Sequence, residues 1–180
     1  MAGDSRDDMG SGVCLMAGCS RCLRFSGLSG VSTEWLVTVS GHRVCAAPLK
    51  PYDVSADGSK QVEQALEQAG KQHKRVLLQF GANWCVWCVR LHGLFQSDRR
   101  IAARLKDSYV VALIDVSEGH NAAVNERFGK PTRFGLPAIV VLDEKGKALV
   151  TLDTETVEEG NGHNATKVLA FLDEWAVKRP

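Results

Sequence analysis

Two short runs of nearly continuous apolar residues constrain the fold of this chain more than any other feature. They are RVLLQFG at residues 75–81 and YVVALIDV at residues 109–116. Runs of this length without polar alternation are typical of strands buried on both faces of a sheet. Helical patterns precede, separate and follow them, and this alternation favours parallel strands covered by helices. The sequence therefore predicts an α/β domain with a central sheet.

Local signals divide the remaining sequence into helices and a hairpin. Asp57, Ser97 and Asn164 each precede a segment with apolar residues at helical spacing, so each is expected to cap a helix. A further helix is expected over NAAVNERFGK, ending at Gly129. Residues 138–152, AIVVLDEKGKALVTL, form two apolar runs around a turn that contains Gly. They predict an antiparallel hairpin at one edge of the sheet.

Composition separates the first part of the chain from the rest. Residues 1–50 are rich in Gly, Ser and Cys and show no sustained period. We therefore expect a poorly ordered N-terminal arm, followed by a domain over residues 51–180. The 22 Lys and Arg against 21 Asp and Glu leave a formal net charge of +1, so no field favours nucleic acid. No apolar run approaches the roughly 18 residues of a membrane span, so no stable membrane insertion is expected.

The six cysteines fall into two unlike groups. Cys14, Cys19, Cys22 and Cys45 lie in the arm, where Cys19 and Cys22 have the spacing of half a zinc site. The sequence of the arm offers no second half-site. An unstructured arm, or sequence that the mature protein lacks, is the favoured interpretation, and a zinc site is the alternative.

The second group is the pair Cys85 and Cys88 in NWCVWCVR, just after the run at residues 75–81. Their spacing suits a zinc site, a structural disulfide or a redox pair. Zinc needs further ligands at comparable spacing, which the sequence of the domain lacks, and a disulfide across so short a loop restricts the unfolded chain little. A cysteine at the start of a helix lies near unpaired backbone N–H groups, which favour its thiolate. Cys85 is expected there, so the residues favour redox chemistry.

Together with the order of elements, two motifs resemble the thioredoxin family. They are FGANWCVWC, which ends at Cys88, and Gly135-Leu136-Pro137 ahead of a strand. The resemblance covers about residues 55–178. The sequence is most similar to single-domain bacterial thioredoxin-like proteins with a Trp-Cys-Val-X-Cys motif, akin to the C-terminal domain of membrane thiol-disulfide interchange reductases. It implies a thioredoxin fold, with a central mixed sheet flanked by helices.

The resemblance also assigns the site residues. Cys85 is expected to be the nucleophile and Cys88 the resolving thiol. The residues expected to contact substrate are Trp84, Val86, Trp87, Leu136 and Pro137. A cis peptide bond before Pro137 would place the Leu136 backbone beside the cysteines, where an extended substrate can pair with it. Trp84 is expected to pack while bordering the site, and Trp87 either to present a platform to substrate or to fold back.

Three departures from the family's pattern bear on the chemistry. Gln79 stands where thioredoxins carry a buried carboxylate, and an amide cannot accept a proton from Cys88, so proton transfer relies on water or another group. Val86-Trp87 replaces the family's Gly-Pro pair. Residues 152–163 are longer and more acidic than a minimal thioredoxin needs, and either shape the choice of partner or form a solvated loop.

The expected function is that of a thiol-disulfide oxidoreductase, more a reductant than an oxidant, acting on disulfides or dithiols of client proteins. A partner protein would supply electrons, and no cofactor is expected because electrons pass through Cys85 and Cys88 alone. The alternative is a polypeptide-binding module or chaperone with incidental redox activity. The resemblance favours the periplasm or cell envelope, and the cytoplasm is the alternative because no clear signal peptide is present.

Overall fold

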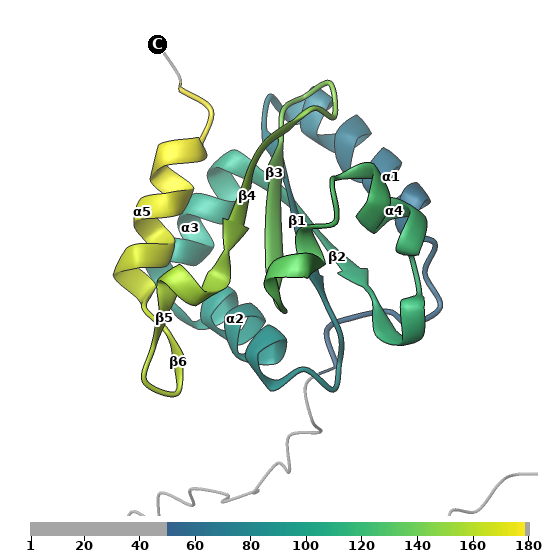
Figure 1. Cartoon of the computed structure of the whole chain (residues 1–180). Coiled ribbons are helices and arrows are strands. Elements are labelled where there is room, and N and C mark those ends of the chain that lie inside the picture. The colour runs from purple at the N-terminus through teal and green to yellow at the C-terminus, as the bar shows by residue number, and fades with distance from the viewer. Residues whose placement is uncertain (1–49, 179–180) are drawn as a thin grey trace, which may run out of the picture. The chain divides into compact units, whose positions relative to one another are not determined.

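A four-stranded mixed sheet organises residues 50–178, which are the residues that the computed structural model describes (Figure 1). Its strands are β1 (Arg75–Gly81), β2 (Tyr109–Asp115), β3 (Ala138–Leu142) and β4 (Ala148–Asp153). They lie in the order β2-β1-β3-β4, with β1 parallel to β2, and with β3 antiparallel to both β1 and β4. The predicted α/β class, mixed sheet and hairpin are confirmed. The expected arm and its four cysteines lie outside the described residues.

Five α-helices and one small hairpin complete the described part of the chain. The helices are α1 (Gly58–Gln72), α2 (Val86–Ser97), α3 (Arg99–Ser108), α4 (Ala122–Arg127) and α5 (Ala165–Trp175). The hairpin consists of β5 (Glu158–Glu159) and β6 (Gly162–His163). Short 3-10 turns lie at Ser117–Gly119, Pro131–Phe134 and Thr154–Val157. Within residues 50–178, no helix has both the length and the apolar character that crossing a membrane requires.

Helix caps were predicted well, with one correction. The carboxylate of Asp57 accepts backbone N–H groups at the start of α1, and the side chain of Asn164 does the same for α5. The predicted cap Ser97 is instead the last residue of α2. Asp98 caps α3, because its Oδ1 accepts the backbone N–H groups of Arg100 and Ile101 at 2.9 Å and 3.2 Å. The same residue ends α2 by donating its own N–H to the carbonyl of Leu94.

The helices cover the two faces of the sheet as separate layers. Figure 1 shows α2, α3 and α5 on one side and α1 and α4 on the other, and the buried residues divide in the same way. Alternate side chains of β1 enter different layers, since Leu78 and Phe80 pack with α1 while Leu77 packs with α2, α3 and α5. Gln79 points to the α2 side, where its amide bonds the carbonyl of Cys88. The central strand thus brings one polar side chain beneath the cysteines.

Strand β2 departs in part from its prediction as a buried strand. Val111 is 37% exposed, whereas its neighbours Ala112 and Ile114 are buried. The reason is its place in the sheet, since β2 is an edge strand that pairs with β1 alone. An edge strand keeps one side open, which uninterrupted apolar sequence does not reveal.

Candidate functional site

Cys85 and Cys88 form a disulfide where β1 gives way to α2. Their Cα atoms are 5.2 Å apart, within the range that a disulfide spans. Cys85 is the N-cap of α2, and its Sγ accepts the backbone N–H of Cys88 at 3.2 Å. The sulfur therefore satisfies one of the unpaired N–H groups at the start of the helix, as the sequence predicted.

The two sulfur-bearing residues differ in their access to solvent. Cys85 is 7% exposed and Cys88 is 0% exposed. Cys88 lies one turn inside α2 and packs in a cluster with Tyr52 and Ala82. Cys85 is therefore the more accessible residue of the pair.

The two tryptophans of the motif behave in opposite ways. Trp84, predicted to pack, is 69% exposed, and Val86 is 58% exposed. Trp87 instead folds back: the ring of His163 meets it edge-on at 5.5 Å between centroids, and the guanidinium of Arg90 lies 5.2 Å from its centroid. The expected packing of Trp84 was wrong, because this side chain lies exposed in the turn before α2, whereas His163 of the β5–β6 hairpin covers Trp87.

Residues 152–163 form structure rather than a plain solvated loop. They include the end of β4, a 3-10 turn and the β5–β6 hairpin, with Thr154 and Val157 buried. The hairpin ends at His163, both of whose ring nitrogens are buried without a hydrogen-bond partner. Burial and the charge of Arg90 lower the pKa of His163, which favours the neutral ring against Trp87.

The second predicted motif also lies at the disulfide. The Leu136-Pro137 peptide bond is cis, which confirms the expectation for Pro137. Leu136 packs against the cluster that holds Cys85 and Cys88. The hydroxyl of Thr154 donates to the carbonyl of Pro137 and thereby ties this segment to the turn after β4.

Polar residues form a layer beneath the disulfide, in which Gln79 was expected from the sequence and Tyr52 and Asn83 were not. Tyr52 is 3% exposed and lies in the segment before α1. Its backbone N–H donates to Asn83 Oδ1 at 3.0 Å, and Asn83 Nδ2 donates to its carbonyl at 2.8 Å. Gln79, which is fully buried, donates to Tyr52 Oη at 2.7 Å. An isolated Tyr before a helix carries no signal of this role, since the contacts depend on the folded chain.

A groove adjoins the exposed side of the motif. It has a volume of about 980 Å³ and is lined in part by Val54, Trp84 and His120. Asp115, at the end of β2, also lines it and is 1% exposed. Its carboxylate accepts both the backbone N–H and the hydroxyl of Ser117, at 3.0 Å and 2.9 Å. The groove thus offers apolar and polar groups next to Cys85.

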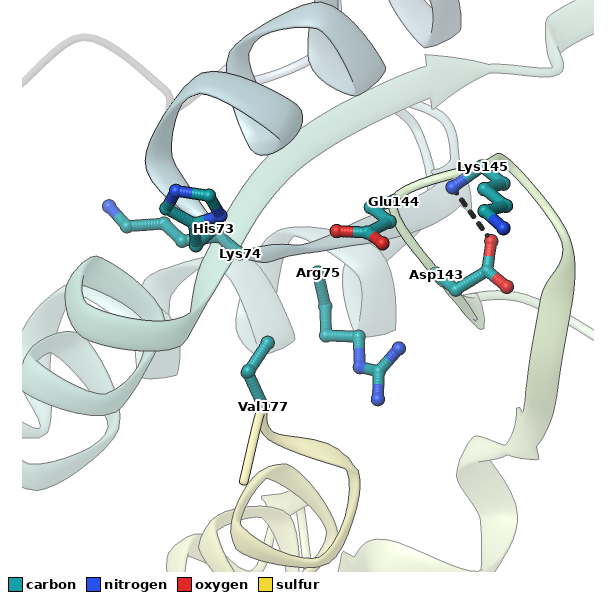
Figure 2. A pocket seen from close by; sticks show the side chains of 7 residues that line it. All are labelled: His73, Lys74, Arg75, Asp143, Glu144, Lys145 and Val177. Carbon is teal, nitrogen blue, oxygen red and sulfur yellow. Dashed lines mark hydrogen bonds between the residues drawn. The ribbon is translucent and has the colours of Figure 1, made fainter. Parts of the chain in front are cut away.

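A smaller pocket of about 420 Å³ lies at the opposite end of the sheet, between the start of β1, the β3–β4 turn and the end of α5 (Figure 2). The residues that line it are His73, Lys74, Arg75, Asp143, Glu144, Lys145 and Val177. Asp143 Oδ1 accepts the backbone N–H of Lys145, as the dashed line in Figure 2 marks. Over residues 50–178, no three His, Cys, Asp or Glu side chains gather as metal ligands.

Comparison with known proteins agrees with this geometry. The family model described as thioredoxin-like matches residues 57–144. The solved disulphide isomerase from Xylella fastidiosa Temecula1 is 29% identical, with a TM-score of 0.62, and covers 71% of this chain and 98% of that one. The thiol:disulfide interchange protein DsbD of Ralstonia nicotianae is 31% identical over 87 residues, which are 48% of this chain and only 14% of that protein. The domain built around the Cys85–Cys88 disulfide therefore has a thioredoxin-like fold, and over residues 57–144 its sequence is similar to the thioredoxin-like family.

Proposed function

We propose that the protein reduces disulfides of client proteins, with Cys85 as the nucleophile and Cys88 as the resolving thiol. The observation that carries this assignment is the unequal exposure of the two cysteines, together with the backbone N–H that Cys85 Sγ accepts. A thiolate at Cys85 is both reachable and stabilised by the start of α2. Cys88, one turn inside the helix, is held within reach of Cys85 and away from clients.

The proposed exchange takes place in two balanced steps. The Cys85 thiolate attacks a client disulfide, so that a Cys85–client bond forms and one client sulfur leaves as a thiolate. The Cys88 thiol gives its proton to water and attacks Cys85 Sγ, which re-forms the Cys85–Cys88 disulfide and releases the second client thiolate. Two electrons pass from the protein to the client. A partner protein then reduces the disulfide by the same steps in reverse.

The surface around Cys85 suits an extended polypeptide. Trp84 and Val86 expose apolar area beside the disulfide, and the groove next to them carries both apolar and polar groups. Leu136 lies against the cysteine cluster, so we expect a client strand to bond its backbone. This exposed apolar surface also favours the second candidate, a binding module for which redox chemistry is incidental.

Reduction of insulin disulfides by dithiothreitol tests the proposal. Every protein is prepared with serine at Cys14, Cys19, Cys22 and Cys45, so that only the proposed pair reacts. In that background Cys85→Ser is expected to fall to the uncatalysed rate. Cys88→Ser is expected to accumulate a mixed disulfide with the client, visible on a non-reducing gel. An unchanged rate for Cys85→Ser would sink the enzymatic function, and binding of reduced client by that variant would then support the binding module.

The direction of electron flow has its own measurement. The equilibrium of the Cys85–Cys88 pair with a glutathione buffer gives its reduction potential. A value near about −270 mV, as in thioredoxin, supports a reductant, and one near about −120 mV, as in a strong oxidant, contradicts it.

A further inference from the structure

The buried side of the disulfide is closed by two neutral side chains. Cys88 and Gln79 are 0% exposed, and Tyr52 is 3% exposed. Gln79 Nε2 donates to Tyr52 Oη at 2.7 Å and to the carbonyl oxygen of Cys88 at 3.2 Å. When the disulfide opens, the Cys88 sulfur is left in this buried site, where a charged or polar atom without a partner is costly.

The two bonds of Gln79 fix the orientation of its amide. If the amide were turned over, its oxygen would face the carbonyl oxygen of Cys88, and two acceptors would meet. In this orientation Gln79 Nε2 donates to Tyr52 Oη, and an amide nitrogen cannot accept the hydroxyl hydrogen in return. Gln79 Oε1 has no hydrogen-bond partner. The hydrogen of the Tyr52 hydroxyl is therefore free to donate to a different group.

Gly81 shows which group that is. A Cβ added to Gly81 would lie under 3.0 Å from both Tyr52 Oη and Cys88 Sγ. Both atoms therefore border the same point, and a side chain at Gly81 would occupy it. Tyr52, Cys85 and Cys88 also belong to one buried cluster. The sulfur of Cys88 is thus a reacting atom that lies beside the hydroxyl of Tyr52.

The hydroxyl keeps its proton at neutral pH. Burial raises the pKa of Tyr52 and the charge of Asp115 adds to the increase, while the hydrogen bond from Gln79 opposes it. Tyr52 is therefore a hydrogen-bond donor and not a base. A sulfur in a disulfide or a thiol is a weak acceptor, whereas the Cys88 sulfur of the open pair becomes a strong acceptor once it releases its proton to attack Cys85. Such a donor stabilises the reduced pair more than the oxidised pair.

We propose that Tyr52, oriented by Gln79, donates a hydrogen bond to the Cys88 sulfur in the reduced protein and thereby favours the open form of the redox pair. This inference rests on the proposed function. It gives the buried side of the cysteine pair a neutral hydrogen-bond donor, where thioredoxins carry a carboxylate. It makes Tyr52 a determinant of the reduction potential, although Tyr52 lies outside the Cys-X-X-Cys motif.

The test is the glutathione equilibrium of Tyr52→Phe, in the background that keeps only Cys85 and Cys88. Two glutathione thiols reduce the disulfide to two protein thiols and leave as one glutathione disulfide, so the balance is fully defined. Loss of one net hydrogen bond is expected to shift the equilibrium about three- to tenfold toward the protein disulfide. An equilibrium equal to that of the parent protein would overturn the inference.

Tyr109→Phe is the matched control. Tyr109 is likewise 3% exposed, and its hydroxyl donates to the carbonyl of Leu172 at 2.7 Å, in the layer with α5. Tyr109→Phe removes the same hydroxyl from an equally buried site, so the free energy of unfolding is expected to fall. The glutathione equilibrium is expected to stay at the parent value. A shift as large as that of Tyr52→Phe would show a general effect of lost hydroxyls and would contradict the inference.

A second variant keeps the test decisive if Tyr52→Phe does not fold. Gln79→Met retains the length of the side chain and removes both donated bonds, together with the unpartnered Oε1. The hydroxyl then loses its orientation, so a shift toward the disulfide is again expected, and no shift would overturn the inference. Because this equilibrium needs no client, failure to reduce insulin would refute the proposed function alone.

Discussion

The two ends of the central sheet present opposite arrangements of polar and apolar groups. At the cysteine end, where β1 leads into α2, Trp84 and Val86 are exposed while Gln79 and Tyr52 are buried beneath the disulfide. At the turn end, where the β3–β4 turn meets the start of β1, charged side chains line a pocket (Figure 2). There Asp143 accepts the backbone N–H groups of Lys145 and Lys147, both at 2.9 Å.

The difference separates a surface that suits a partner from one that stabilises the fold. Covering exposed apolar side chains with a partner lowers the free energy of the system. The buried amide of Gln79 also keeps one acceptor, Oε1, without a hydrogen bond. The Oδ1 atom of Asp143 already accepts two backbone N–H groups within its own turn. A pocket alone therefore does not mark the site, and the exposed apolar side chains beside the disulfide distinguish the cysteine end from the charged turn end.

The largest effect is expected from Gly81→Ala at the cysteine end. The new Cβ would approach Tyr52 Oη and Cys88 Sγ to under 3.0 Å, so the cluster must shift. Overpacking of this kind lowers the free energy of unfolding by about 1–3 kcal/mol. Gly93→Ala, in α2 with no atom within 4 Å of its new Cβ, is the control and is expected to gain up to about 1 kcal/mol from helix propensity. Urea denaturation measures both, and a neutral Gly81→Ala would disprove the close packing.

Trp84→Ala should lower activity without lowering stability. The side chain is 69% exposed, so its removal is expected to change the free energy of unfolding by no more than about 0.5 kcal/mol. Loss of an aromatic contact to the client is expected to reduce kcat/KM for insulin about tenfold. Lys145→Ala, at the turn end, serves as the control and should retain the parent value. Equal kcat/KM for the two variants would mean that Trp84 does not contact clients.

Asp143→Ala should have the smallest effect, and it should lower stability without changing the redox equilibrium. Loss of two bonds to backbone N–H groups is expected to cost about 0.5–1 kcal/mol of unfolding free energy, a range that allows for solvent screening. The glutathione equilibrium should not change. Glu144→Ala, exposed on the same turn, is the control and should leave stability unchanged.

The pH dependence of this loss gives a second check. The hydrogen bond from the backbone N–H of Lys147 lowers the pKa of Asp143, burial opposes it, and the bond from Lys145 and the charges of Arg75 and Lys147 lower it further. A carboxyl whose pKa is lowered by folding stabilises the protein above its ordinary pKa, and that stabilisation is lost as pH falls through the folded value. The difference in unfolding free energy between the parent and Asp143→Ala should therefore be largest at neutral pH and vanish in acid. A difference that persists in acid would exclude the carboxylate as its source.

Features set by neighbouring residues could be predicted from the sequence, and features set by distant ones could not. The caps at Asp57 and Asn164, the strand before the cysteines and the position of Cys85 at the start of α2 depend on adjacent residues. The cis bond before Pro137 followed from the resemblance to a family. Ser97 and Asp98 compete for one cap, and single-sequence patterns do not resolve a shift of one residue.

The behaviour of the tryptophans and of Tyr52 depends on contacts across the fold. Trp87 is covered because His163 arrives from the β5–β6 hairpin, and nothing in the motif itself indicates this partner. Tyr52 bonds Asn83 across 31 positions of sequence. Gln79 was foreseen as a departure from the family, and the structure identifies the side chain that its amide contacts.

The position of Tyr52 also bears on where the functional unit begins. The match to the thioredoxin-like family covers residues 57–144, so it starts after Tyr52 and ends before α5. A fragment trimmed to that match would keep both cysteines and the cis proline. It would lose the tyrosine beneath them and helix α5, whose Leu172 is buried in the core. The part of a redox domain that matches its family is thus smaller than the piece of chain that an engineer must transplant to carry its chemistry into another protein.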